Sequence, residues 1–172
     1  DISSACHEAG IPLFIDGARL GFGLAAQGND VTLKDIARLA DVFYIGGTKV
    51  GALFGEAVVV TNPSLLRHFT PLIKQHGALL AKGRLLGLQF EALFADGLYF
   101  RIGRETVERA VRLKAAFEDH GFKAAIDSPT NQQFFTLPNP VIDRLKENVS
   151  FEMWGPRGET ESTVRFVTGW ST

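Results

Sequence analysis

The sequence has one cysteine, almost no net charge and no long apolar run. Because Cys6 is the only cysteine among 172 residues, no disulfide can form within the chain, which fits a reducing compartment such as the cytoplasm. Lysine and arginine total 18 against 19 acidic residues, and a net charge of −1 offers no electrostatic footprint for nucleic acid or an anionic membrane. No apolar stretch is long enough to cross a bilayer. We therefore expect neither nucleic acid nor a membrane as a partner.

Apolar runs alternate with helical patterns along the chain. The runs predict strands over residues 11–16, 42–46, 57–61, 122–126, 133–137, 150–154 and 164–168. Helical patterns cover residues 64–95, 104–120 and 141–147. Strands that alternate with helices favour parallel crossover connections and an α/β layer architecture. Ligands of such sheets bind at the carboxyl ends of the strands.

Local signals mark several boundaries between these elements. Thr32 and Asp35 have the spacing of a capping box and predict a short helix from residue 33. A loop punctuated by Gly21, Gly23 and Gly28 is expected after the first strand. Residues 85–94 are apolar on more than one face, so we expect this helix to lie between domains or at a subunit contact.

A lone lysine stands between two apolar runs, in the glycine-rich segment YIGGTKVG (residues 44–51). Lysine is rarely buried unless it is paired or used. A desolvated lysine loses its proton readily and becomes an amine nucleophile. The alternative is an exposed hairpin position for Lys49, and spacing alone does not separate the two.

A carboxylate follows the first predicted strand. Asp16 comes directly after the apolar residues 13–15, so it falls at the same edge of the sheet as Lys49. An amine and a carboxylate in this arrangement suit pyridoxal 5'-phosphate, since the amine binds the aldehyde and the carboxylate keeps the ring nitrogen protonated. The alternative for Asp16 is an ordinary turn at the end of a strand.

Three segments resemble the threonine aldolase and aromatic amino acid beta-eliminating lyase family. They are FIDGARL (residues 14–20), GTKVG (residues 47–51) and VRFVT (residues 164–168). The spacing between the first two is the more specific part, because either motif alone is a weak signal. The resemblance implies the aspartate aminotransferase fold, which is fold type I of the pyridoxal phosphate enzymes.

The resemblance also implies roles for residues around the cofactor. Lys49 would bind the cofactor covalently, Asp16 would face its ring nitrogen, and Arg19 would reach the cofactor oxygen and the substrate carboxylate. The Thr48 hydroxyl is a candidate contact of the cofactor phosphate, with local turn chemistry as the equal alternative. For Arg19 the alternative is a surface salt bridge.

Two further arginines are candidates. Arg165 lies in an apolar strand and needs an anionic partner there, and a guanidinium matches an amino acid carboxylate well. The alternative is an arginine that faces water from an edge strand. Arg84 falls near a family position that contacts the cofactor phosphate of the neighbouring subunit, although its spacing from Lys49 differs by a few residues. If that match holds, the active site is shared between two chains.

The resemblance implies three parts of the chain. Residues 1–75 would be the C-terminal part of a large mixed or parallel-sheet domain that binds the cofactor, residues 76–99 a helical connector, and residues 100–172 a small α/β domain. The chain lacks an initiator methionine and opens with a pattern that reads as the tail of a helix. We therefore expect a longer protein, in which the main phosphate-binding loop and the ring-stacking residue precede Asp1.

The function implied is a pyridoxal phosphate lyase that acts on an amino acid with a polar group at the beta carbon. Aldol cleavage of threonine or allo-threonine to glycine and acetaldehyde is our first hypothesis, and beta-elimination on an aromatic or other beta-substituted amino acid is the alternative. A homodimer or homotetramer is the expected assembly, and no metal site is expected. A different class also stays open, in which the chain is a non-catalytic fragment or an assembly partner.

Overall fold

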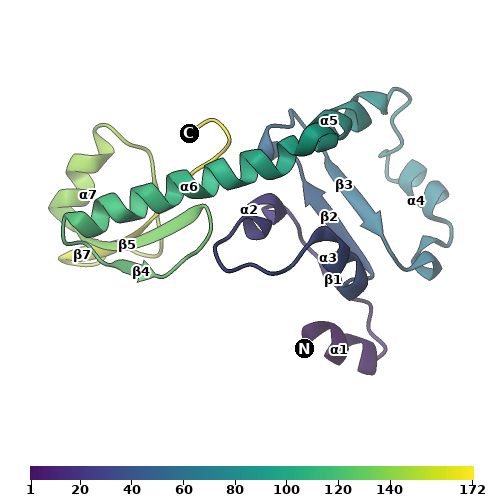
Figure 1. Ribbon diagram of the computed structural model, residues 1–172, viewed down its shortest axis with the longest axis horizontal. Helices are drawn as coiled ribbons and strands as arrows, with labels where there is room; N and C mark the ends of the chain where they lie inside the picture. Colours follow the sequence, from purple (N-terminus) through teal and green to yellow (C-terminus); the bar gives the residue numbers. More distant parts are fainter.

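Two β-sheets lie towards opposite ends of one long helix, α6 (Leu98–Asp119), in the computed structural model, which describes residues 1–172 (Figure 1). The N-terminal unit holds a three-stranded sheet and shorter helices: α1 (Ile2–Glu8), β1 (Phe14–Ile15), α2 (Leu20–Leu24), α3 (Leu33–Leu39), β2 (Val42–Gly46), η1 (Thr48–Val50), β3 (Glu56–Val60), η2 (Pro63–Leu66), α4 (Phe69–Gln75), α5 (Arg84–Phe94) and η3 (Ala95–Gly97). The C-terminal unit holds a four-stranded sheet and one helix: β4 (Ala124–Ile126), β5 (Gln132–Pro138), α7 (Asn139–Lys146), β6 (Glu152–Met153) and β7 (Glu161–Val167).

The N-terminal sheet is mixed, with strand order β1-β2-β3. The expected parallel crossover is present between β1 and β2, whose connection contains α2 and α3. In contrast, β3 runs antiparallel to β2, and Gly46 pairs with Glu56. The sheet is therefore mixed, which is one of the two forms expected, because the connection from Gly47 to Gly55 contains only one short 3-10 turn and cannot cross the sheet.

The first strand is shorter than predicted, with only two residues of the expected span 11–16. Its ladder begins late because the Leu13 amide donates to the side chain of Asp41, at 2.8 Å, rather than to a neighbouring strand. Ile11 and Phe14 are both more than half exposed, so the sheet edge here is open.

The expected glycine-punctuated loop is instead partly helical, as α2. Gly21 faces the ring of Tyr99, whose Cζ would lie 3.0 Å from an added Cβ. A Cβ at Gly103 of α6 would lie 2.6 Å from the carbonyl oxygen of Gly21. The loop prediction is wrong for Gly21, which allows two helices to approach closely, and holds after α2, where Gly28 has the positive φ of a turn, +80°.

Several local predictions are confirmed. The Thr32 side chain accepts from the Asp35 amide, and the Asp35 side chain accepts from the Thr32 amide, so α3 has the predicted capping box. The helix expected over residues 104–120 begins earlier, at Leu98, after Gly97 with φ +68°. No helix of the chain combines the length and apolar character needed to cross a membrane.

The C-terminal sheet has the order β4-β5-β7-β6, and all its neighbouring strands are antiparallel. Each strand predicted beyond residue 120 is present, with shifted ends. One face packs on α6 and α7 through a core of Phe135, Leu137, Ile142, Val164 and Phe166. The domain boundaries at residues 75 and 99 stay predictions.

Candidate active site

The ends of β1 and β2 build the site. These strands are parallel with Ile15 paired to Phe43, so the residues that follow, Asp16 and Tyr44, lie side by side. Glycines allow the two backbone segments after these strands to approach each other closely. A Cβ at Gly17 would lie 1.7 Å from the Tyr44 carbonyl oxygen, and one at Gly46 would lie 2.5 Å from the Ala18 carbonyl oxygen. A larger residue at either position would force the two strand ends apart.

Asp16 is exposed and is held through one oxygen. The hydroxyl of Tyr44 donates to its Oδ1, and the Ala18 amide donates to the same atom at 3.0 Å. Tyr44 is the main reason that the pKa of the Asp16 carboxyl lies below its ordinary value, and the Ala18 amide and the charges of Lys49 and Arg19 act in the same direction. Asp16 is therefore charged at neutral pH, and its Oδ2 accepts no hydrogen bond within the chain.

Tyr44 is a site residue that the sequence reasoning missed. Its hydrogen bond to Asp16 raises the pKa of the Tyr44 hydroxyl to about 12. Its ring centroid lies 6.0 Å from that of Phe14. The available signal was a polar group in the otherwise apolar run from Val42 to Ile45, directly before the two glycines.

Lys49 lies in η1, within the connection between the antiparallel strands β2 and β3. The hairpin alternative and the site interpretation thus describe the same place, because the connection begins at Gly46, whose amide donates to the carbonyl of Gly17 at 2.9 Å. Val50 next to it is fully buried and anchors the turn. The Lys49 amine makes no hydrogen bond or ion pair within the chain, while Thr48 is exposed and also unpaired.

A second tyrosine, Tyr99, holds the start of the connection between β2 and β3. The Tyr99 hydroxyl donates to the carbonyl of Gly46 at 3.1 Å, and its side chain is fully buried. Burial raises the pKa of Tyr99 to about 12. Tyr99 therefore ties the start of α6 to the strand that leads to Lys49.

Arg19 completes the group. It occupies the N-cap position of α2, three residues after Asp16, and its Nε is buried without an acceptor. The donor set is an unpaired amine, a half-used carboxylate and an arginine with an unsatisfied buried donor. These fit the aldehyde, the ring nitrogen and an anionic oxygen of pyridoxal 5'-phosphate respectively.

The other candidate arginines lie elsewhere. Arg165 belongs to β7 of the C-terminal sheet, which Figure 1 shows towards the other end of α6 from β1 and β2. It pairs with Glu152 and Gln132, and no contact joins it to Asp16 or Lys49. Arg84 is the first residue of α5, where it is exposed and has no hydrogen-bond or charged partner in the chain.

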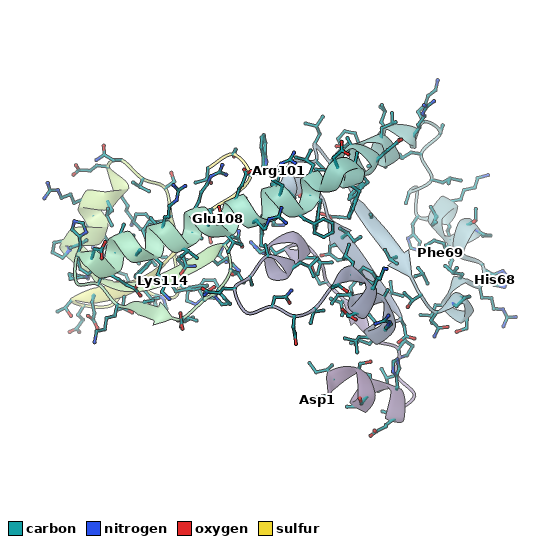
Figure 2. All side chains as sticks on the ribbon, viewed as in Figure 1. Asp1, His68, Phe69, Arg101, Glu108 and Lys114 are labelled. Carbon is teal, nitrogen blue, oxygen red and sulfur yellow. The ribbon has the colours of Figure 1, made fainter.

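The helix α4 lies at the outer edge of the N-terminal unit. Figure 2 labels His68 and Phe69 at the outer edge of the N-terminal unit, on the opposite side from Glu108 and Lys114 of α6. His68 has φ +59° at the N-cap of α4 and is exposed.

Comparison with known proteins gives the class first. The family model for beta-eliminating lyases matches residues 1–139, and the chain belongs to this family. Enzymes of this family depend on pyridoxal phosphate. The predicted fold is confirmed, since a solved Listeria monocytogenes structure described as a putative L-allo-threonine aldolase aligns at a TM-score of 0.75 with 20% identity, over 98% of this chain and 49% of that one.

Within that class, the more similar proteins are threonine aldolases. The chain is 45% identical to the solved threonine aldolase of Leishmania major, with a TM-score of 0.96 over 100% of this chain and 50% of that one. It is 30% identical to the low specificity L-threonine aldolase of Pseudomonas aeruginosa, over 99% of this chain and 49% of that protein. The chain thus spans about half the length of the curated relatives it matches.

Proposed function

We propose that the protein is a pyridoxal phosphate-dependent lyase that cleaves threonine or allo-threonine to glycine and acetaldehyde. The observation that supports this most directly is the grouping of Asp16, Lys49 and Arg19 around the ends of β1 and β2. Lys49 and Arg19 both lie close enough to lower the pKa of the Asp16 carboxyl. The likeness to threonine aldolases of two organisms supports the choice of substrate.

Each residue has a distinct task in this proposal. Lys49 supplies the amine that binds the cofactor and, once released by the substrate, can carry a proton on Nζ. Asp16 offers its free Oδ2 to the ring nitrogen, while Tyr44 and Ala18 fix its other oxygen. Arg19 neutralises an anionic oxygen. When bound, pyridoxal phosphate supplies an electron sink for negative charge at the substrate's alpha carbon.

The substrate would be oriented by its carboxylate, bound to Arg165 and to Arg19. The orientation decides which bond at the alpha carbon breaks. In aldol cleavage it is the bond to the beta carbon, after the beta hydroxyl gives up its proton. In the alternative, beta-elimination, the alpha proton leaves first and the beta substituent follows. The same residues of this chain serve both reactions, and the relatives' names favour the first.

We also propose a homodimer or homotetramer in the cytoplasm. Arg84 would reach the cofactor phosphate of the neighbouring subunit, and Thr48 that of its own. Unpaired apolar surface supports an assembly, since Leu53 of the loop before β3 is 84% exposed and Leu85 of α5 is 61% exposed. The single cysteine agrees with a reducing compartment.

The test is to load the full-length protein with pyridoxal phosphate, reduce it with borohydride and map the label by mass spectrometry. We expect a pyridoxyl group on Lys49 and none in Lys49→Ala. In a separate sample that is loaded with cofactor but not reduced, threonine should give glycine and acetaldehyde in equal amounts. A full-length protein that takes up no cofactor would refute the enzyme and support the non-catalytic alternative. If Lys49 is labelled and the unreduced protein releases 2-oxobutanoate and ammonia from threonine, the protein is an eliminating lyase.

A further inference from the structure

Arg165 is held from three sides within the C-terminal sheet. Its Nη1 donates to Gln132 Oε1 at 3.0 Å, and its guanidinium carbon lies 4.8 Å from the ring centroid of Trp154. Its Nη2 donates to the carboxylate of Glu152, which is paired with it in register across β6 and β7. These three contacts fix the orientation of the guanidinium.

The contact with Glu152 uses only one of the two nitrogens on one edge of the Arg165 guanidinium. Nε of Arg165 is buried and donates to no acceptor. Nε and Nη2 point from the same edge of the guanidinium, and this edge binds both oxygens of one carboxylate side by side. Glu152 engages Nη2 alone. A carboxylate that reached both nitrogens would satisfy a donor that Glu152 leaves unpaired.

Glu152 is also easily released. Its side chain is 65% exposed, against 16% for Arg165, and it lies on the edge strand of the sheet. An ion pair with one partner in water is weak, because both solvent and salt screen it. The Glu152 carboxylate can thus return to water when a competing anion binds Arg165.

We propose that Glu152 competes with the substrate carboxylate for Arg165 and thereby sets the affinity for the amino acid. This inference rests on the proposed function, in which Arg165 binds that carboxylate. Only the fraction of molecules with a free Arg165 binds substrate, so the apparent affinity falls by that fraction. For an exposed ion pair of ordinary strength, removing Glu152 tightens binding about two- to six-fold.

The experiment compares Glu152→Gln with Glu161→Gln in the full-length, cofactor-loaded protein. Glu161 is an exposed acid on β7 that forms no ion pair, so its variant removes the same charge from the same sheet. The measurements are the KM and kcat for L-threonine and the calorimetric Kd for glycine. We expect Glu152→Gln to lower both KM and Kd about two- to six-fold with kcat unchanged, and Glu161→Gln to change neither.

Two results would overturn the inference. If Glu152→Gln raises KM, Glu152 positions Arg165 instead of competing for it. If the two variants change KM equally, the effect comes from the overall charge of the protein and not from competition for Arg165. Arg165→Lys separates this from the proposed function, because loss of the side-on fork should raise KM about tenfold or more. If Arg165→Lys leaves KM unchanged while threonine is still cleaved, Arg165 does not bind substrate and the inference loses its premise, although the lyase stands.

Discussion

Tyr44 and Asp16 change each other's acidity at the edge of the N-terminal sheet. The hydrogen bond lowers the pKa of Asp16 and raises that of Tyr44 to about 12, above its ordinary value of 10.0. A tyrosine with a raised pKa in the folded state stabilises the fold fully below pH 10, and this contribution is lost as the pH rises through 12. For Asp16 the sign is opposite, and its contribution is lost as the pH falls below its ordinary titration range.

The first prediction concerns Tyr44→Phe. The difference in unfolding free energy between wild type and Tyr44→Phe should be constant from pH 8 to 10 and should shrink between about pH 10 and 12. Urea denaturation at each pH measures it. In the background of Asp16→Asn, which keeps the shape but removes the charge, the shrinkage should be smaller. A difference that stays level up to pH 12 would contradict the pairing.

The sequence predicted Asp16 and Lys49 as site residues because each follows the end of a strand, and it predicted Arg19 through the family resemblance. It did not identify Tyr44 or Glu152. Both act through a partner on a neighbouring strand, and that partner depends on the register of the sheet. Register is a property of the folded pair of strands, so a single chain read in order does not reveal it.

At the scale of elements, the crossing of α2 and α6 depends on backbone contact. We expect Gly103→Ala to lower the unfolding free energy by about 1–3 kcal/mol, because the new Cβ would meet the Gly21 carbonyl oxygen at 2.6 Å and neither backbone can move freely. Urea denaturation measures this. Gly87→Ala in α5 is the matched control, since nothing lies within 4 Å of its Cβ position.

Gly87→Ala should be neutral or should stabilise the protein by up to about 1 kcal/mol, as expected for alanine in a helix. Equal effects of the two substitutions would show that the helices can separate without cost. The crossing also explains why the sequence predicts a loop where α2 forms. Glycine lowers helix propensity, and only the position of α6, eighty residues later in the chain, gives Gly21 its packing role.

At the scale of the whole molecule, a buried polar contact joins the end of β7 to α6. The Thr168 hydroxyl donates to the carbonyl of Thr106 at 2.8 Å, and both residues are buried. Thr168→Val keeps the shape and removes the donor. We expect a loss of about 0.5–1.5 kcal/mol in unfolding free energy, measured by urea denaturation. The exposed Thr160→Val should cost little, and an equal loss there would show that the contact contributes nothing specific.

The α/β class and nearly all elements of the C-terminal unit follow from the alternation of apolar residues. The placement of the two sheets along α6 does not, because it depends on contacts such as Tyr99 with Gly46 and Thr168 with Thr106. These pairs are separated by more than fifty residues in sequence.

The two attachment points on α6 are seven residues apart, which is roughly 10 Å of rigid rod. Tyr99 is hydrogen-bonded to Gly46, at the end of the strand before Lys49. Thr106 is hydrogen-bonded to Thr168, which follows the strand that contains Arg165. The length of helix between Tyr99 and Thr106 therefore helps to set the distance between the strand before Lys49 and the strand that contains Arg165. An insertion of one residue between positions 99 and 106 would rotate one attachment point by about 100° relative to the other, even if each sheet folded correctly by itself.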